Sequence, residues 1–160
     1  MTEILPTVTI PGAPLPVDLT VSTGLALANP ELDIGTGSQI VTFVRVRNVE
    51  LNILEASDQD SIEDGARDSF DFLSGLDVSI RADFNGVTNE LFIATLPDGD
   101  PQIGSATRNL NLTVVNNEAD VLDYLLAPGG YEIILGITGI VPQDNIILSG
   151  SLRYRLGLGF

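Results

Sequence analysis

Apolar side chains recur at every second position along most of this chain, and no other feature restricts its fold as strongly. Between residues 109 and 114, Leu110, Leu112 and Val114 alternate with two asparagines and a threonine. Because successive side chains of a β-strand point to opposite faces, this period predicts strands that are buried on one face. The sequence therefore predicts an all-β protein.

Strand-like segments follow one another along the chain, separated roughly every 8–12 residues by Gly, Pro, Asn or Asp. They cover residues 17–28, 39–54, 76–84, 90–95, 108–115, 131–141 and 145–160, with residues 4–10 as a further candidate. Asn85 and Gly86 form a strong hairpin signal, since both residues accept a positive φ. Without alternating helices, this order predicts an antiparallel Ig-like β-sandwich of about seven to eight strands with Greek-key connections.

The long segment 39–54 changes its buried face. Val44 and Val46 occupy one phase of the alternation, whereas Val49 and Leu51 occupy the other. A strand switches faces in this way through an extra residue or a sharp bend, so we expect a β-bulge near Asn48.

One short helix is expected within residues 117–127. Asn117 is a suitable N-cap, acidic residues follow it in the first turn, and Val121, Leu122 and Leu125 form an apolar stripe. The Pro-Gly-Gly sequence that begins at Pro128 ends the pattern. A second helical turn is possible over residues 66–72.

The residue inventory removes several kinds of chemistry. The chain has no Cys, His, Trp or Lys, and its seven basic residues are all Arg. Disulfides, Cys or His metal sites, Cys or Lys nucleophiles and Ser–His pairs all need residues that this chain lacks. Two carboxylates in a cleft can hydrolyse a glycosidic bond, but nothing in the sequence places a pair in a cleft. We therefore expect a protein that is not an enzyme.

The charge balance is strongly acidic, with 22 Asp and Glu residues and a net charge of −15. Nucleic-acid binding needs cationic residues that displace phosphate counterions, so we expect no nucleic-acid partner. The lack of Lys beside many Asp has two interpretations. One is a genome that encodes Arg in place of Lys, and the other is adaptation to high salt, where screening reduces self-repulsion.

An acidic connection is the candidate metal site. Eight of the acids lie between Glu55 and Asp77, and Asp98-Gly99-Asp100 adds a smaller pair. Clustered carboxylates suit calcium, although Ile62 and Gly65 break the EF-hand pattern. The other interpretation is a solvated acidic loop. If calcium is a cofactor, the candidate ligands are Asp58, Asp60, Glu63, Asp64, Asp98 and Asp100.

Two strands near the ends of the chain are candidate interaction strands. A long apolar strand of this kind is either docked in its own sheet or offered to a neighbour. We therefore divide the chain into residues 1–16, a Pro-rich tether or donated strand, and residues 17–160, the β-sandwich domain. The candidate residues are Thr7, Val8, Thr9, Ile10, Leu152, Tyr154, Leu156, Leu158 and Phe160.

Residues 1–16 lack the basic start of a signal peptide. Met1 is either a native cytoplasmic start or a start added to a trimmed mature protein, and the Pro/Thr-rich lead favours the trimmed, exported form. The longest uncharged stretches, residues 4–17 and 133–143, are shorter than the ~20 apolar residues of a membrane-spanning helix. We expect no membrane span and a place outside the cell or in its envelope, with the cytoplasm as the alternative.

Parts of the chain from Asp68 onward resemble uncharacterised bacterial envelope lipoproteins. The matching segments are residues 68–80 (DSFDFLSGLDVSI), 122–139 (LDYLLAPGGYEIILGITG), 141–142 (VP) and 148–155 (LSGSLRYR). The resemblance implies an exported β-domain and carries no functional residues over. The lipid-anchoring Cys of such proteins is absent here, which removal of a leader would explain.

Together these features predict an exported structural or interaction module at the cell surface. A self-assembling filament or shell subunit joined by β-strand donation is one alternative, and a calcium- or ligand-binding β-sandwich is the other. The expected partner is a protein or a second copy of the chain.

Overall fold

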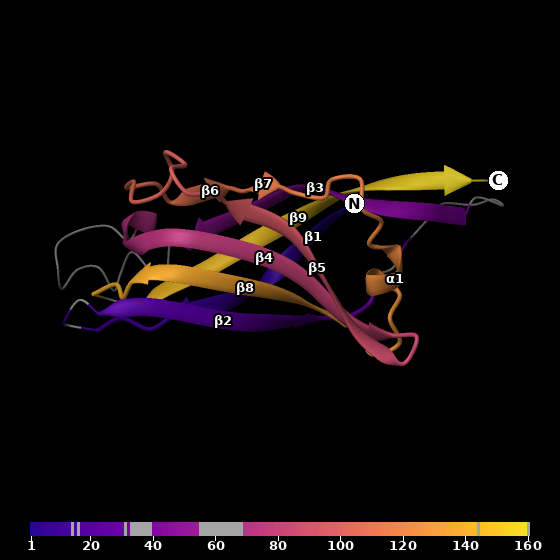
Figure 1. Cartoon of the computed structure of the whole chain (residues 1–160), viewed down its shortest axis with the longest axis horizontal. Helices are drawn as coiled ribbons and strands as arrows, with labels where there is room; N and C mark the ends of the chain where they lie inside the picture. Colours follow the sequence, from indigo (N-terminus) through magenta and orange to yellow (C-terminus); the bar gives the residue numbers. More distant parts are fainter. Residues whose placement is uncertain are drawn as a thin grey trace.

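A computed structural model of the chain describes residues 1–13, 15, 17–30, 32, 40–54, 69–143 and 145–159. Its strands form two antiparallel sheets that pack face to face around one core (Figure 1). The predicted antiparallel Ig-like β-sandwich is therefore confirmed. The described residues contain nine strands, slightly more than expected.

Sheet A has the strand order β1-β9-β3-β6, and sheet B has the order β2-β8-β4-β5-β7. The strands of sheet A are β1 (Thr2–Ile10), β9 (Ile146–Gly159), β3 (Ile40–Ile53) and β6 (Asn109–Asn111). The strands of sheet B are β2 (Asp18–Leu27), β8 (Tyr131–Ile140), β4 (Leu73–Phe84), β5 (Val87–Leu96) and β7 (Thr113–Val114).

Sheet B contains the predicted Greek key. Strands β4, β5 and β7 lie side by side in chain order, and β8 then returns to pair with the free side of β4. This is the spatial order 4-1-2-3 that defines the motif. The predicted hairpin joins β4 to β5, with φ values of 56° at Asn85 and 76° at Gly86.

Residues 108–115 form two short strands where one was predicted. β6 pairs with β3 in sheet A, whereas β7 pairs with β5 in sheet B. The chain changes sheet at Leu112, which is buried and donates its N–H to the carbonyl of Val49 at 3.0 Å. The alternation showed that these residues are strand but contained no sign of the change of sheet.

The expected bulge in β3 is confirmed. The pairing of β3 with β9 shifts between Val46 and Asn48, and the buried residues change phase there. The bulge therefore keeps the apolar side chains on both sides of it, Val46 and Val49 among them, on the core.

The helix expected over residues 117–127 is much shorter, a single turn α1 at Leu122–Leu125. Asn117 does not cap it, because the preceding segment is bound to the edge of β3. The N–H of Val121 donates to the carbonyl of Val44 at 2.8 Å, and Asp120 accepts from the N–H of Val44 at 2.9 Å. The possible second helical turn is a 3-10 turn at Phe70–Phe72, while residues 66–68 lie outside the described part.

Residues 2–10 belong to the sandwich, although the sequence led us to place a domain boundary after residue 16. They form β1, an edge strand of sheet A that pairs antiparallel with β9. Leu5 and Ile10 on its inner face are buried in the core. In this single chain the strand folds back onto its own sheet.

Candidate interaction site

Strands β3 and β9 extend past the rest of sheet A as a two-stranded ribbon. The register of β1 with β9 starts at Thr2 opposite Arg153, whereas β9 stays paired with β3 until Gly159 lies opposite Ile40. Figure 1 shows both strands running past the point marked N, beyond α1. We call residues 40–45 and 155–159 the projecting ribbon.

One side of this ribbon is an unpaired strand edge. Tyr154 turns its backbone toward β1: its N–H donates to the carbonyl of Met1 at 2.8 Å, and its carbonyl accepts from the Met1 nitrogen at 3.2 Å. Because backbone groups alternate in direction along a strand, Leu156 and Leu158 point their N–H and C=O groups to the same side. No described residue pairs with β9 there past Met1. We call this segment, residues 155–159, the open β9 edge.

The inner face of the ribbon is apolar and partly uncovered. Leu156 and Val41 pack against the edge of the core, whereas Leu158, which lies opposite Val41, is 49% exposed. Ile40 lies opposite Gly159 on the outer face of the ribbon and is 59% exposed. Leu126, just after α1, is 53% exposed. An exposed strand edge with apolar side chains is a template for another strand.

A stacked aromatic side chain covers the outer face of the ribbon. Phe43 lies across Gly157, where an added Cβ would be 2.1 Å from Cε1 of the ring. The guanidinium carbon of Arg45 lies 4.5 Å from the ring centroid, and Arg45 also forms an ion pair with Glu118. Gly157 therefore lets the two strands and the ring pack closely.

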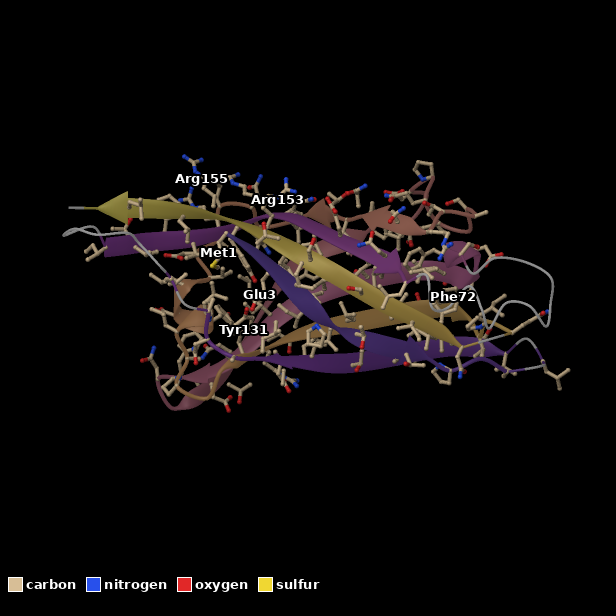
Figure 2. The ribbon with its side chains drawn as sticks, turned by 180° about the vertical axis from the view of Figure 1, so that it is seen from behind. Met1, Glu3, Phe72, Tyr131, Arg153 and Arg155 are labelled. Atoms are coloured by element: carbon tan, nitrogen blue, oxygen red, sulfur yellow. The ribbon has the colours of Figure 1, made fainter. Side chains whose placement is uncertain are left out.

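Four arginines gather on the outer face of sheet A at the base of this ribbon. Arg45 lies directly opposite Arg155, Arg153 lies opposite Asn48, and Arg47 is the extra residue of the bulge. Figure 2 shows Arg153 and Arg155 on the outer side of β9. Within the described residues, only Arg45 of the four forms an ion pair. We call these four residues the basic patch.

A polar cluster of two buried tyrosines and the half-buried Glu3 joins the two sheets just inside the ribbon. The hydroxyl of Tyr131 in β8 donates to Oε2 of Glu3 in β1, and the hydroxyl of Tyr154 lies 3.4 Å from the same oxygen. Figure 2 shows Glu3 and Tyr131 close together between the sheets. Burial, followed by the neighbouring phenol and carboxylate, raises the pKa of Tyr131, and burial with the charge of Glu3 raises the pKa of Tyr154. Both phenols stay protonated and donate.

A shallow groove lies on the outer face of sheet B. It encloses about 690 Å³ and is lined mainly by Ser, Thr and Gly, with Asp77 and Asp98 among its residues. Asp77 accepts a hydrogen bond from the hydroxyl of Thr95 at 2.7 Å. The groove contains no aromatic platform, and the charged groups do not converge on one point.

The candidate calcium ligands are only partly placed. Asp58, Asp60, Glu63 and Asp64 lie outside the described residues. Asp98 borders the sheet B groove, and Asp100 accepts from the backbone N–H and the side-chain amide of Gln102 at 2.8 and 3.2 Å. In the part of the chain that the structure covers, no three acidic side chains come together as a metal site.

The candidate interaction strands have different positions. Residues 7–10 lie in β1, where Val8, Thr9 and Ile10 face β9 of the same chain. In β9, Leu152 and Tyr154 are buried, whereas Leu156 and Leu158 lie on the open edge. Phe160 lies outside the described residues. The structure thus narrows the candidate surface to the ribbon.

The basic patch was not among the sequence predictions, although the sequence contains a signal for it. The pairs Arg45/Arg47 and Arg153/Arg155 each have the two-residue spacing that places side chains on one face of a strand. Recognising the patch also required knowing that β3 and β9 are neighbours, which one sequence does not show.

No family model, curated protein or solved structure matches this chain. Among the described residues, no helix has the length and apolar character needed to cross a membrane.

Proposed function

We propose that this chain is a non-enzymatic interaction module, exported to the cell surface or envelope, that binds a protein partner by adding a strand to the open β9 edge. The observation that carries this proposal is that no described residue pairs with the backbone of Leu156 and Leu158 on the open side of β9. In strand addition, main-chain hydrogen bonds provide affinity, and alternate side chains provide specificity.

Two features of the ribbon and one of β1 support this role. The β9 side of the ribbon is regular, since the two shifts in its pairing with β3 each add a residue to β3 and none to β9. Its inner face offers Leu158 to an incoming apolar side chain. By contrast, the outer edge of β1 contains Pro6 and a bulge between Leu5 and Val8, and both features disfavour edge pairing.

The proposal is tested with Leu158→Pro. Proline removes the N–H that faces the open side but no donor of the β3–β9 ladder, and proline is tolerated at such edge positions. A displayed library of random ten-residue peptides is selected on the unmodified protein, and the selected peptides are then tested on Leu158→Pro and Leu158→Ala. Leu158→Ala is the matched control, because it shortens the side chain and keeps the N–H.

We expect the selected peptides to bind Leu158→Pro at least tenfold more weakly than they bind Leu158→Ala. Equal binding to both variants, or selection of no peptide, would show that the edge is not a strand acceptor. A homodimer joined through two β9 edges is the self-assembly version of the proposal. In that case, light scattering would show a dimer for the unmodified protein and a monomer for Leu158→Pro.

A further inference from the structure

We infer that the strand accepted by the open β9 edge belongs to a partner protein and carries acidic side chains at alternate positions, with apolar side chains between them. This inference rests on the proposed function and adds the chemistry of the partner. It depends on how the open edge and the basic patch are placed relative to each other.

The position of an added strand follows from β9 itself. Such a strand continues the line of β1 along the open side, so that its side chains alternate between the two faces of sheet A. Directly opposed residues of neighbouring strands have Cβ atoms about 4.5–5.5 Å apart. The position beside Arg153 is taken by Thr2 of β1, so the outward side chains of the added strand lie beside Arg155 and Gly157, where the first is also diagonal to Arg153. Inward side chains lie beside Leu156 and Leu158.

The charges of the basic patch lack compensation. Arg47, Arg153 and Arg155 form no ion pair within the described residues, although the chain has 22 acidic residues. Arg45 and Arg155 oppose each other directly across the strands, and like charges in that position are destabilising. Sheet B differs, because Arg81 there is paired with Glu132 at 2.6 Å. Carboxylates of a partner would supply the missing counter-charges in bidentate geometry.

The open β9 edge also favours an acidic polypeptide over other anions. Free N–H and C=O groups at Leu156 and Leu158 are satisfied by another polypeptide backbone, which phosphate polymers and lipid headgroups do not provide. The net charge of −15 repels a long polyanion along the rest of the surface, whereas a short acidic strand meets only the patch. An acidic, extended protein segment fits both features.

The test uses a blocked peptide of alternating Glu and Val, three of each, flanked by Gly. Its binding is compared with a peptide in which Gln replaces each Glu, and with two peptides N-methylated at all Glu or at all Val positions. We expect the Glu peptide to bind at least tenfold tighter than the Gln peptide at low salt, and this ratio to shrink in 1 M salt. One N-methylated peptide should lose binding, since one set of amides faces β9.

The outcomes separate the two proposals. If the Gln peptide binds as well as the Glu peptide, the acidic preference is wrong while strand addition stands. If both N-methylated peptides bind like the parent while Glu still exceeds Gln, strand addition is wrong and the patch binds anions by itself. If the Glu peptide does not bind, the inference is overturned.

A matched pair of variants locates the charge effect. Arg153→Gln/Arg155→Gln lowers the net charge by two in the basic patch, and Thr20→Glu/Ser22→Glu lowers it by two on the exposed outer face of β2. We expect the first variant to lose the preference for Glu over Gln, and the second to keep it. Equal losses would mean that overall charge, and not the patch, determines the preference, which would overturn the inference.

Discussion

Three side chains carry the polar link between the sheets. Tyr131 donates to Glu3 from the opposite sheet, and Tyr154 shares the same carboxylate. Glu3 is half-buried, and removing the donor to a carboxylate in such a place costs about 1–3 kcal/mol. These residues therefore contribute to the docking of β1 as well as to the core.

We predict that Tyr131→Phe lowers the free energy of unfolding by about 1–3 kcal/mol at neutral pH. The measurement is urea denaturation. Tyr124→Phe is the control, because the Tyr124 ring packs edge-on against Phe84 with a centroid distance of 5.1 Å, and that contact survives the loss of the hydroxyl. Equal effects of the two substitutions would show that the hydroxyl of Tyr131 does not stabilise the fold.

The same tyrosines predict a loss of stability in alkali. Their folded pKa values are raised above the ordinary value near 10, so the unfolded chain releases these protons first. The stabilisation that these two pKa shifts contribute is fully present below pH 10. Above pH 10 the free energy of unfolding falls by about 1.4 kcal/mol per pH unit for each tyrosine. Unfolding at several pH values from 9 to 11 checks this, and Tyr131→Phe should give a shallower decline. A free energy that stays constant over that range would contradict the raised pKa values.

At the scale of elements, β1 covers the part of β9 that would otherwise be open. Its residues Leu5 and Ile10 are buried, and burial of such side chains contributes about 1.5–3 kcal/mol each. We predict that removal of residues 1–14 lowers the melting temperature and exposes β9 from Ile146 to Arg153, so that the shortened chain self-associates. Light scattering and thermal unfolding measure both effects. A stable monomer with an unchanged melting temperature would show that β1 is a dispensable tether.

Local patterns predicted which segments form strands and turns better than they predicted which segments contact each other. The strand segments, the Asn85-Gly86 hairpin and the bulge near Asn48 follow from period and turn chemistry. The short helix was overestimated because residues 116–119 form a turn and the N–H of Val121 donates to the carbonyl of Val44, so the preceding residues are not available to an α-helix. The contact of Glu3 with Tyr131 joins residues 128 positions apart, and no local pattern encodes such a contact.

The candidate site was predictable only in part, for the same reason. The alternation identified Leu156 and Leu158 as one face of a strand. Whether their backbone groups are open depends on where β1 stops pairing with β9, which is set by the register of the folded sheet. The arginine pairs likewise became one patch only because β3 and β9 lie side by side.

At the scale of the whole molecule, the charge of −15 opposes compaction through self-repulsion. Screening by salt weakens that repulsion, with a Debye length of about 3 Å at 1 M against ~10 Å at 0.1 M. We predict that the thermal unfolding midpoint rises between 0.05 and 1 M sodium chloride. A midpoint that does not change with salt would rule out the interpretation that the acidic composition is an adaptation to high salt.

The most direct test of the central claim is amide hydrogen exchange at Leu156 and Leu158, measured residue by residue. Both amides should exchange rapidly in the free protein, because they face the open side of β9, and should become protected when the alternating Glu/Val peptide binds. Amides of Arg155 and Gly157, which point toward β3, provide the internal reference. Protection of Leu156 and Leu158 in the free monomer, or no change when the peptide is bound, would contradict the account.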